Sequence, residues 1–147
     1  MTDSSNSATS QTTLHASCVA LDGKGLLILG PSGSGKSALA LQLMALGAVL
    51  VADDYTELAR CDAALIARCP TALRGLIEAR GVGILRADTV ESIPVVLVVD
   101  LGRRETERLP PKRQIILLGQ SLDLVLRRKD SHFPFAVLQV LRAGRRA

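Results

Sequence analysis

Residues 30–37 read Gly-Pro-Ser-Gly-Ser-Gly-Lys-Ser, a complete match to the phosphate-binding loop (Walker A) pattern G-x-x-x-x-G-K-[ST]. Residues 26–29 before the loop are an apolar run, Leu-Leu-Ile-Leu, which is typical of a buried strand. Residues 37–46 after the loop consist of strong helix formers. The alternative, a Gly/Ser-rich turn with a stray lysine, would not require these flanks. The sequence therefore predicts a strand, loop and helix that bind the phosphate groups of a nucleotide.

The loop pattern assigns a task to each kind of residue in it. Glycines permit a tight turn that points backbone N–H groups at phosphate oxygens, and the start of the helix adds a partial positive charge. Lys36 would reach the β- and γ-phosphates, and the Ser37 hydroxyl would hold Mg²⁺. The candidate nucleotide-binding residues are Gly30, Pro31, Ser32, Gly33, Ser34, Gly35, Lys36 and Ser37.

The composition indicates one domain with an aliphatic core. Of the 147 residues, 48% are hydrophobic and only 2% are aromatic, so the core must consist mainly of Leu, Val, Ile and Ala. No apolar run approaches the ~20 residues of a membrane helix, and the polar start lacks a secretion signal. We expect a disordered tail over residues 1–13, a single P-loop domain over residues 14–147, and no membrane partner.

The charge distribution and the cysteines indicate which classes of binding partner and which cellular compartment to expect. The net charge is +4, and much of the positive charge lies in the last third of the chain. This surplus suits an acidic partner or a phosphate ligand, or is simply a solvated basic face. No aromatic stacking platform accompanies it, so we expect no nucleic-acid partner. Cys18, Cys61 and Cys69 lack metal-like spacing and are interpreted as buried or half-buried thiols in a reducing cytoplasm.

The chain is rich in predicted strands and poor in predicted helices, which favours an α/β fold with a mixed β-sheet around one main helix. Residues 93–101 form the clearest buried strand, with Pro94 near its start. Gly47 is expected to end the main helix. Other predicted elements are strands at 17–21, 48–52, 56–61, 64–69, 76–80, 115–118 and 122–126, a helical turn at 86–92, a mobile loop at 103–113 and a helix at 134–141.

Two adjacent carboxylates, Asp53 and Asp54, end the apolar strand 48–52, where open α/β sheets place their ligands. They follow Lys36 by one helix and one strand, so the fold can bring them beside the phosphate loop. One carboxylate could help to hold Mg²⁺, and the other could accept a proton from an attacking hydroxyl. The alternative is an Asx turn at the end of a strand, and the nearby phosphate loop favours the functional interpretation.

Three further residues are ambiguous when taken alone. Glu78 and Arg80 share one face of a strand beside a Gly-Val-Gly turn, where they could line a cleft. Glu78 could then complete the Mg²⁺ shell and Arg80 could neutralise phosphate charge, whereas the ordinary alternative is a surface ion pair. His15, before the first predicted strand, is by itself an exposed terminal histidine with no claim to function.

Together these motifs resemble the catalytic, C-terminal domain of the HPr kinase/phosphorylase family, in a short form without the separate N-terminal domain. The resemblance runs from residue 15 to about residue 113 and includes Leu-Val-Ala-Asp-Asp at 50–54. Residues 76–84, Leu-Ile-Glu-Ala-Arg-Gly-Val-Gly-Ile, are similar to the family signature E-x-R-G-x-G-I. The family phosphorylates a serine of HPr, a small carrier protein of the sugar phosphotransferase system. Its fold is similar to the nucleotide domain of phosphoenolpyruvate carboxykinase, and its hexamers imply a homo-oligomer.

The resemblance implies roles for the matching residues. Lys36 and the loop would hold the phosphates of ATP, and Ser37 and Glu78 would be Mg²⁺ ligands supported by Asp53. Asp54 matches the base that takes the proton from the attacking serine, and His15 matches a histidine near the transferred phosphoryl group. Arg108 matches a catalytic arginine on a mobile loop. The expected catalytic set is Asp54, Asp53, Lys36, His15, Arg80 and Arg108.

One segment departs from the family pattern. The full-length family carries a P-V-R-P-G-R-N stretch linked to phosphorolysis of the serine phosphate, whereas residues 126–132 here read Leu-Arg-Arg-Lys-Asp-Ser-His. We therefore predict a cytoplasmic ATP- and Mg²⁺-dependent serine kinase acting on an HPr-type carrier, and do not predict the reverse reaction. The alternatives are a small-molecule P-loop kinase and a non-catalytic, nucleotide-dependent regulator.

Overall fold

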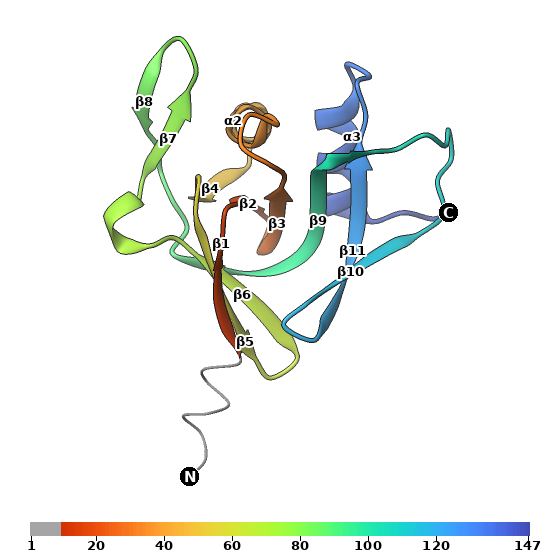
Figure 1. The fold of residues 1–147 in the computed structure, drawn as a ribbon, viewed down its shortest axis with the longest axis horizontal. Coiled ribbons are helices and arrows are strands. Elements are labelled where there is room, and N and C mark those ends of the chain that lie inside the picture. Colours follow the sequence, from red (N-terminus) through yellow and green to blue (C-terminus); the bar gives the residue numbers. More distant parts are fainter. Residues whose placement is uncertain (1–9) are drawn as a thin grey trace.

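The computed structural model describes residues 10–147, which form a curled mixed sheet with two α-helices packed on one face (Figure 1). This architecture confirms the predicted mixed sheet around a main helix. The helices are α2 (Lys36–Ala45) and α3 (Phe133–Ala143). The strands of the large sheet are β1 (Gln11–Leu14), β2 (Ser17–Leu21), β3 (Lys24–Leu29), β4 (Val49–Ala52), β5 (Thr56–Cys61), β6 (Ala64–Arg68), β9 (Ser92–Arg104), β10 (Arg113–Leu117) and β11 (Gln120–Arg127).

Strand β9 is the central strand of the sheet and pairs with three other strands. Its 13 residues pair in parallel with β3 and β11 and, near its start, antiparallel with β6. The long curved strand in Figure 1 therefore joins the β5–β6 hairpin to the strand that carries the phosphate loop. Gly25 makes this possible, because a Cβ there would lie 2.7 Å from Ile93 Cγ2 and 2.9 Å from the Pro94 carbonyl oxygen.

Apolar side chains fill both faces of the sheet. On one face, Leu26 and Ile28 of β3 pack with Leu39 and Leu43 of α2 and with buried residues of α3. On the other face, residues of β2, β3 and β9 pack against β5, β6 and β11, onto which the sheet curls. The phosphate loop is thus attached to a strand buried on both faces, which fixes its position.

A separate two-stranded hairpin stands beside α2 and projects from the molecule at the upper left of Figure 1. It consists of β7 (Leu76–Ala79) and β8 (Gly83–Arg86), and the 3₁₀ turn η1 (Thr71–Leu73) precedes it. Ile77 of β7 is buried in the same core cluster as α2, which holds the hairpin against the helix.

Several predicted elements need correction. The disordered tail predicted over residues 1–13 is wrong for residues 11–13, which belong to β1 and pair antiparallel with β5. Residues 1–9 of the predicted tail lie outside the described part. The helical turn predicted at 86–92 is also wrong, because residues 87–91 are not helical and β8 ends at Arg86. The loop predicted from 103 begins only after Arg104, and its first residue, Glu105, is buried in an ion pair with Arg113.

Candidate active site

The phosphate loop turns from β3 into α2 through residues that few side chains could replace. Gly35, directly before the helix, has a φ of 101°, which favours glycine. Lys36 is buried, and its Nζ donates to the carbonyl oxygens of Gly30 at 2.7 Å and Pro31 at 3.0 Å. The ammonium group is therefore held inside the loop, beside the N–H groups of the first helical turn.

Asp53 is the structural centre of the site. This buried carboxylate accepts hydrogen bonds at Oδ1 from the hydroxyls of Ser17 at 2.8 Å and Ser37 at 2.7 Å. Its Oδ2 accepts the backbone N–H of Glu78 at 3.1 Å. One side chain thus joins β2, the start of α2 and the β7–β8 hairpin, and fixes the orientation of the Ser37 hydroxyl.

Asp54, the next residue, has the opposite environment. Its side chain is 61% exposed, and its φ of 70° lies in the left-handed region. The Tyr55 N–H donates to the Asp53 carbonyl oxygen at 2.8 Å, which closes a one-residue turn around Asp54. Strained conformations of this kind persist where the surrounding structure enforces them and cluster at functional sites.

His15 contacts Asp54 directly. His15 Nε2 and Asp54 Oδ1 are hydrogen-bonded at 2.8 Å. Two further hydrogen bonds fix the backbone around this pair. The Ala16 N–H donates to the Asp54 carbonyl oxygen at 3.0 Å, and the Thr56 hydroxyl donates to the Ala16 carbonyl oxygen at 2.9 Å. The Tyr55 ring lies 5.3 Å from the His15 ring, centroid to centroid. His15 follows β1, so it lies between the first two strands rather than before the first one.

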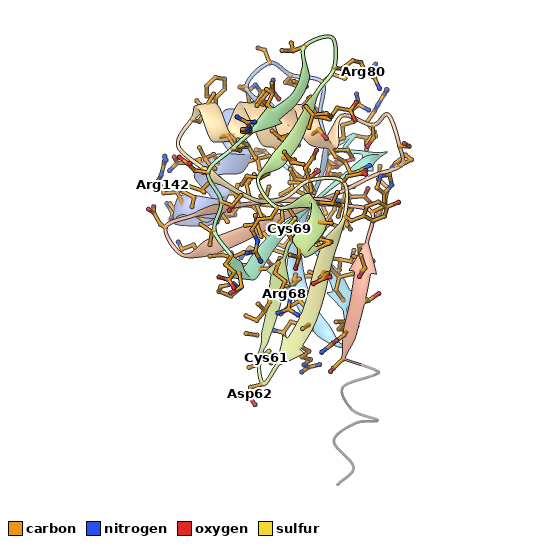
Figure 2. The ribbon with its side chains drawn as sticks, turned by 90° about the vertical axis from the view of Figure 1, so that its left-hand side faces the viewer. Cys61, Asp62, Arg68, Cys69, Arg80 and Arg142 are labelled. Carbon is orange, nitrogen blue, oxygen red and sulfur yellow. The ribbon has the colours of Figure 1, made fainter. Side chains whose placement is uncertain are left out.

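Glu78 and Arg80 complete the site from the hairpin. Both are exposed, and Arg80 follows the last residue of β7. Figure 2 shows Arg80 near the end of this hairpin, at the opposite end of the molecule from Asp62. The hairpin and the start of α2 enclose a cavity of about 540 Å³, here called the hairpin-side cavity. Its walls include His15, Lys36, Ser37, Asp54, Glu78 and Arg80.

The structure does not bring Arg108 to this cavity. Arg108 lines a different cavity of about 340 Å³, together with Leu109 and Pro110 and residues of α3. The catalytic role expected for Arg108 therefore stays a prediction.

The donor set of the site fits a magnesium ion that is bound together with phosphates. No group of three His, Cys, Asp or Glu side chains within residues 10–147 forms a self-sufficient metal site. Mg²⁺ in nucleotide sites, however, takes one or two protein oxygens and fills its shell with phosphate oxygens and water. The Ser37 hydroxyl, oriented by Asp53, and the exposed Glu78 carboxylate on the same cavity supply such oxygens.

Sequence reasoning missed two supporting residues. Ser17 is fully buried and donates to Asp53, and Tyr55 packs its ring beside His15. Ser17 stands at the start of an ordinary apolar strand, and nothing in its sequence context distinguishes it from a structural serine. Only the pairing of β2 with β4, which is a long-range contact, places it next to Asp53.

Comparisons with known proteins relate the chain to one family. The family described as HPr Serine kinase C-terminal domain matches residues 6–101, which include all the residues named above on the hairpin-side cavity. The structure of the Hpr(Ser) kinase/phosphatase from Coxiella burnetii is similar with a TM-score of 0.77 and 30% identity, over 89% of this chain and 94% of that chain.

Curated relatives point to the same family. HPr kinase/phosphorylase of Cupriavidus necator is 39% identical over 125 residues, which cover 77% of this chain and 39% of that protein. The protein of the same name from Leptothrix cholodnii is 40% identical over 113 residues, 68% of this chain and 35% of that protein. The chain spans less than half the length of these relatives. Because the family match covers most of the chain, the chain belongs to the HPr kinase C-terminal domain family.

Proposed function

We propose that this protein is an ATP- and Mg²⁺-dependent serine kinase that phosphorylates an HPr-type carrier protein. The observation that carries the proposal is the hairpin-side cavity, where the phosphate-loop lysine faces the same space as the Asp54–His15 pair and Glu78. A phosphate-binding element and a carboxylate base on one cavity are what phosphoryl transfer to a hydroxyl requires. The names of the relatives given above include both HPr, the carrier, and the kinase activity.

In the proposed reaction, the serine oxygen of the carrier attacks the γ-phosphorus of ATP, and the bond from that phosphorus to the β–γ bridging oxygen breaks. Asp54 accepts the serine proton, and ADP leaves with the bridging oxygen. Asp54 Oδ1 is engaged by His15, whereas Oδ2 has no hydrogen-bond partner within residues 10–147 and is available for the proton. His15 therefore holds the Asp54 carboxylate in place through Oδ1, while Oδ2 accepts the proton.

Charge on the transferred phosphoryl group would be balanced from several sides. The Lys36 ammonium and the loop N–H groups would bind the β- and γ-phosphates, and Arg80 would approach from the hairpin, since Lys36 and Arg80 line the same cavity. Ser37 and Glu78 would hold Mg²⁺, which supplies further charge neutralisation when bound. Asp53 would orient these residues rather than contact the ion, because its oxygens already accept hydrogen bonds from Ser17, Ser37 and the Glu78 N–H.

The remaining parts of the proposal concern location and partners. No helix in the described part of the chain is long and apolar enough to cross a membrane. We propose a cytoplasmic enzyme whose basic C-terminal third docks the carrier, with no nucleic-acid or membrane partner. The homo-oligomer expected from the resemblance stays a prediction, and phosphorolysis is not part of the proposal because residues 126–132 lack the associated motif.

The direct test is incubation of the purified protein with γ-labelled ATP, Mg²⁺ and purified HPr-type carriers. The proposal expects label on a carrier serine, and its loss in Lys36→Ala. Label on no carrier, together with transfer to a small metabolite, would identify a small-molecule kinase instead. Tight ATP binding without any transfer would identify a non-catalytic regulator.

A further inference from the structure

A second cavity lies on the other side of the phosphate loop. It has a volume of about 380 Å³ and is bounded by the loop after β11 and by the start of α3, and is here called the α3-side cavity. It shares Gly35, Ala38 and Gln42 with the hairpin-side cavity. The first turns of α2 are therefore the common wall of the two cavities.

Positively charged side chains line the α3-side cavity. Arg127 and Lys129 line it, and their side chains form no hydrogen bond or ion pair within the part of the chain that the structure describes. Arg128 between them is engaged, since it pairs with Asp130 at 2.8 Å and donates to the Glu105 carbonyl oxygen at 3.3 Å. The engaged arginine anchors the segment, which leaves its two neighbours available for an anion.

The phosphate loop forms part of the wall of the same cavity through Ser34 and Gly35. The Ser34 hydroxyl oxygen is buried within the loop, close to Gly30, and has no hydrogen-bond partner in residues 10–147. The two cations without partners lie on the same cavity as the phosphate loop and the N-terminus of α2, and together these features indicate a site for an anionic ligand.

The arrangement also fixes the direction of a bound nucleotide, if the proposed function is correct. The transferred phosphoryl group must lie in the hairpin-side cavity, because Asp54 is there to accept the proton. The phosphate chain then runs across the start of α2, away from Asp54, and leads into the α3-side cavity. Leu39 and Pro134 line that cavity and offer apolar surface to a base.

We propose that the α3-side cavity takes the nucleoside end of the phosphate donor, with Lys129 and Arg127 facing its α-phosphate. The inference deepens the proposed function and rests on it. It assigns a binding role to the same segment, residues 126–132, that departs from the family sequence.

The test compares two ligands in the presence of Mg²⁺ by isothermal titration: ATP, and inorganic pyrophosphate, which lacks both the nucleoside and the α-phosphate. Lys129→Ala should weaken ATP binding about tenfold, the scale of one lost charge-assisted contact, and leave pyrophosphate binding unchanged. Ser131→Trp, which fills the α3-side cavity from an exposed position, should have the same selective effect. Lys112→Ala removes the same charge from an exposed lysine that does not line this cavity and should change neither affinity.

The outcomes separate this inference from the proposed function. If Lys129→Ala and Ser131→Trp leave ATP binding unchanged, or weaken pyrophosphate as much as ATP, the inference is wrong and the proposed function stands. If the wild-type protein binds neither ligand, both are wrong. Circular dichroism and thermal melting of each variant show whether a loss of binding reflects a loss of fold.

Discussion

The two sides of the phosphate loop carry different chemistry. The hairpin side holds a carboxylate, an imidazole and a second carboxylate, in Asp54, His15 and Glu78. The α3 side holds Arg127, Lys129 and apolar surface. The hairpin side also holds the cations Lys36 and Arg80, so what distinguishes it is the exposed carboxylate of Asp54. The same helix start separates the two sides, so a single anionic chain lying across it would have one end beside this proton acceptor and its other end beside Arg127 and Lys129. If the proposed function is right, the flanking segments, rather than the phosphate loop, determine which end of the nucleotide reacts.

The largest expected effect concerns the base on the hairpin side. Asp54→Asn should lower kcat by about 1,000-fold, because the amide cannot accept the serine proton, while the affinity for ATP changes little. Asparagine tolerates the left-handed backbone that Asp54 adopts, so the fold should be retained. The measurement is steady-state carrier phosphorylation alongside ATP titration.

A matched control is available for this substitution. Asp62 is also exposed and also left-handed, with a φ of 56°, but lies in the β5–β6 hairpin turn far from the cavity (Figure 2). Asp62→Asn should leave kcat unchanged. Equal loss of activity in the two variants would contradict the assignment of Asp54 as the base.

The next largest effect concerns the loop that both sides share. Lys36→Ala should weaken binding of ATP and of pyrophosphate alike, by about 100-fold, because it removes a buried positive charge from the loop that is proposed to hold the phosphates. This pattern contrasts with Lys129→Ala, which should affect ATP alone. Unchanged pyrophosphate affinity in a folded Lys36→Ala protein would show that the loop does not hold phosphate.

A smaller effect is expected at Ser17, which supports Asp53 on the hairpin side. Ser17→Ala removes one donor to Asp53 and loosens its hold on Ser37, so the Mg²⁺ concentration for half-maximal activity should rise about tenfold. Ser121→Ala removes an exposed hydroxyl that bonds Gln114 and should not change the Mg²⁺ dependence. A Ser17→Ala protein with normal Mg²⁺ dependence would reduce Ser17 to a packing role.

The smallest effect concerns a stabilising contact next to the α3 side. Glu105 is buried against Arg113, whose hydrogen bonds lower the pKa of this carboxyl from its ordinary 4.5 to about 2. Because the folded-state pKa is lowered, the stabilisation is complete above the ordinary pKa and is lost as the pH falls from about 4.5 towards 2. Glu105→Gln should therefore cost about 1 kcal/mol of unfolding free energy at pH 7, and this difference should shrink over that acid range.

Urea unfolding at several pH values measures the Glu105 effect. Glu107→Gln, at an exposed neighbouring position, is the control and should leave the free energy of unfolding nearly unchanged. A Glu105→Gln deficit that stays constant from pH 7 to pH 2 would show that the ion pair is not its cause.

Much of the site could be predicted from the sequence, because its residues occur in short, nearly contiguous motifs. The phosphate loop, the Asp53–Asp54 pair and the segment of Glu78 and Arg80 each carry a local pattern, and the structure brings them to one site. His15 gained its expected role only through the resemblance, and its contact with Asp54 spans 39 positions in the chain.

The features that sequence reasoning missed depend on long-range pairing. Gln11–Leu14 is polar and mostly exposed, so it resembles a disordered tail until β5 provides its hydrogen-bond partners. The segment of β8 is equally exposed and is a strand only because β7 pairs with it. The burial of Glu105 and the placement of Arg108 on another cavity likewise have no signal in the local sequence.

A crystal structure with Mg²⁺ and a non-hydrolysable ATP analogue would show whether one nucleotide spans both cavities in a fixed direction. We expect the γ-phosphate between Lys36 and Asp54, and the base in the α3-side cavity beside Lys129. A nucleotide bound in the reverse direction, or a phosphate loop left empty at saturating analogue, would contradict this expectation.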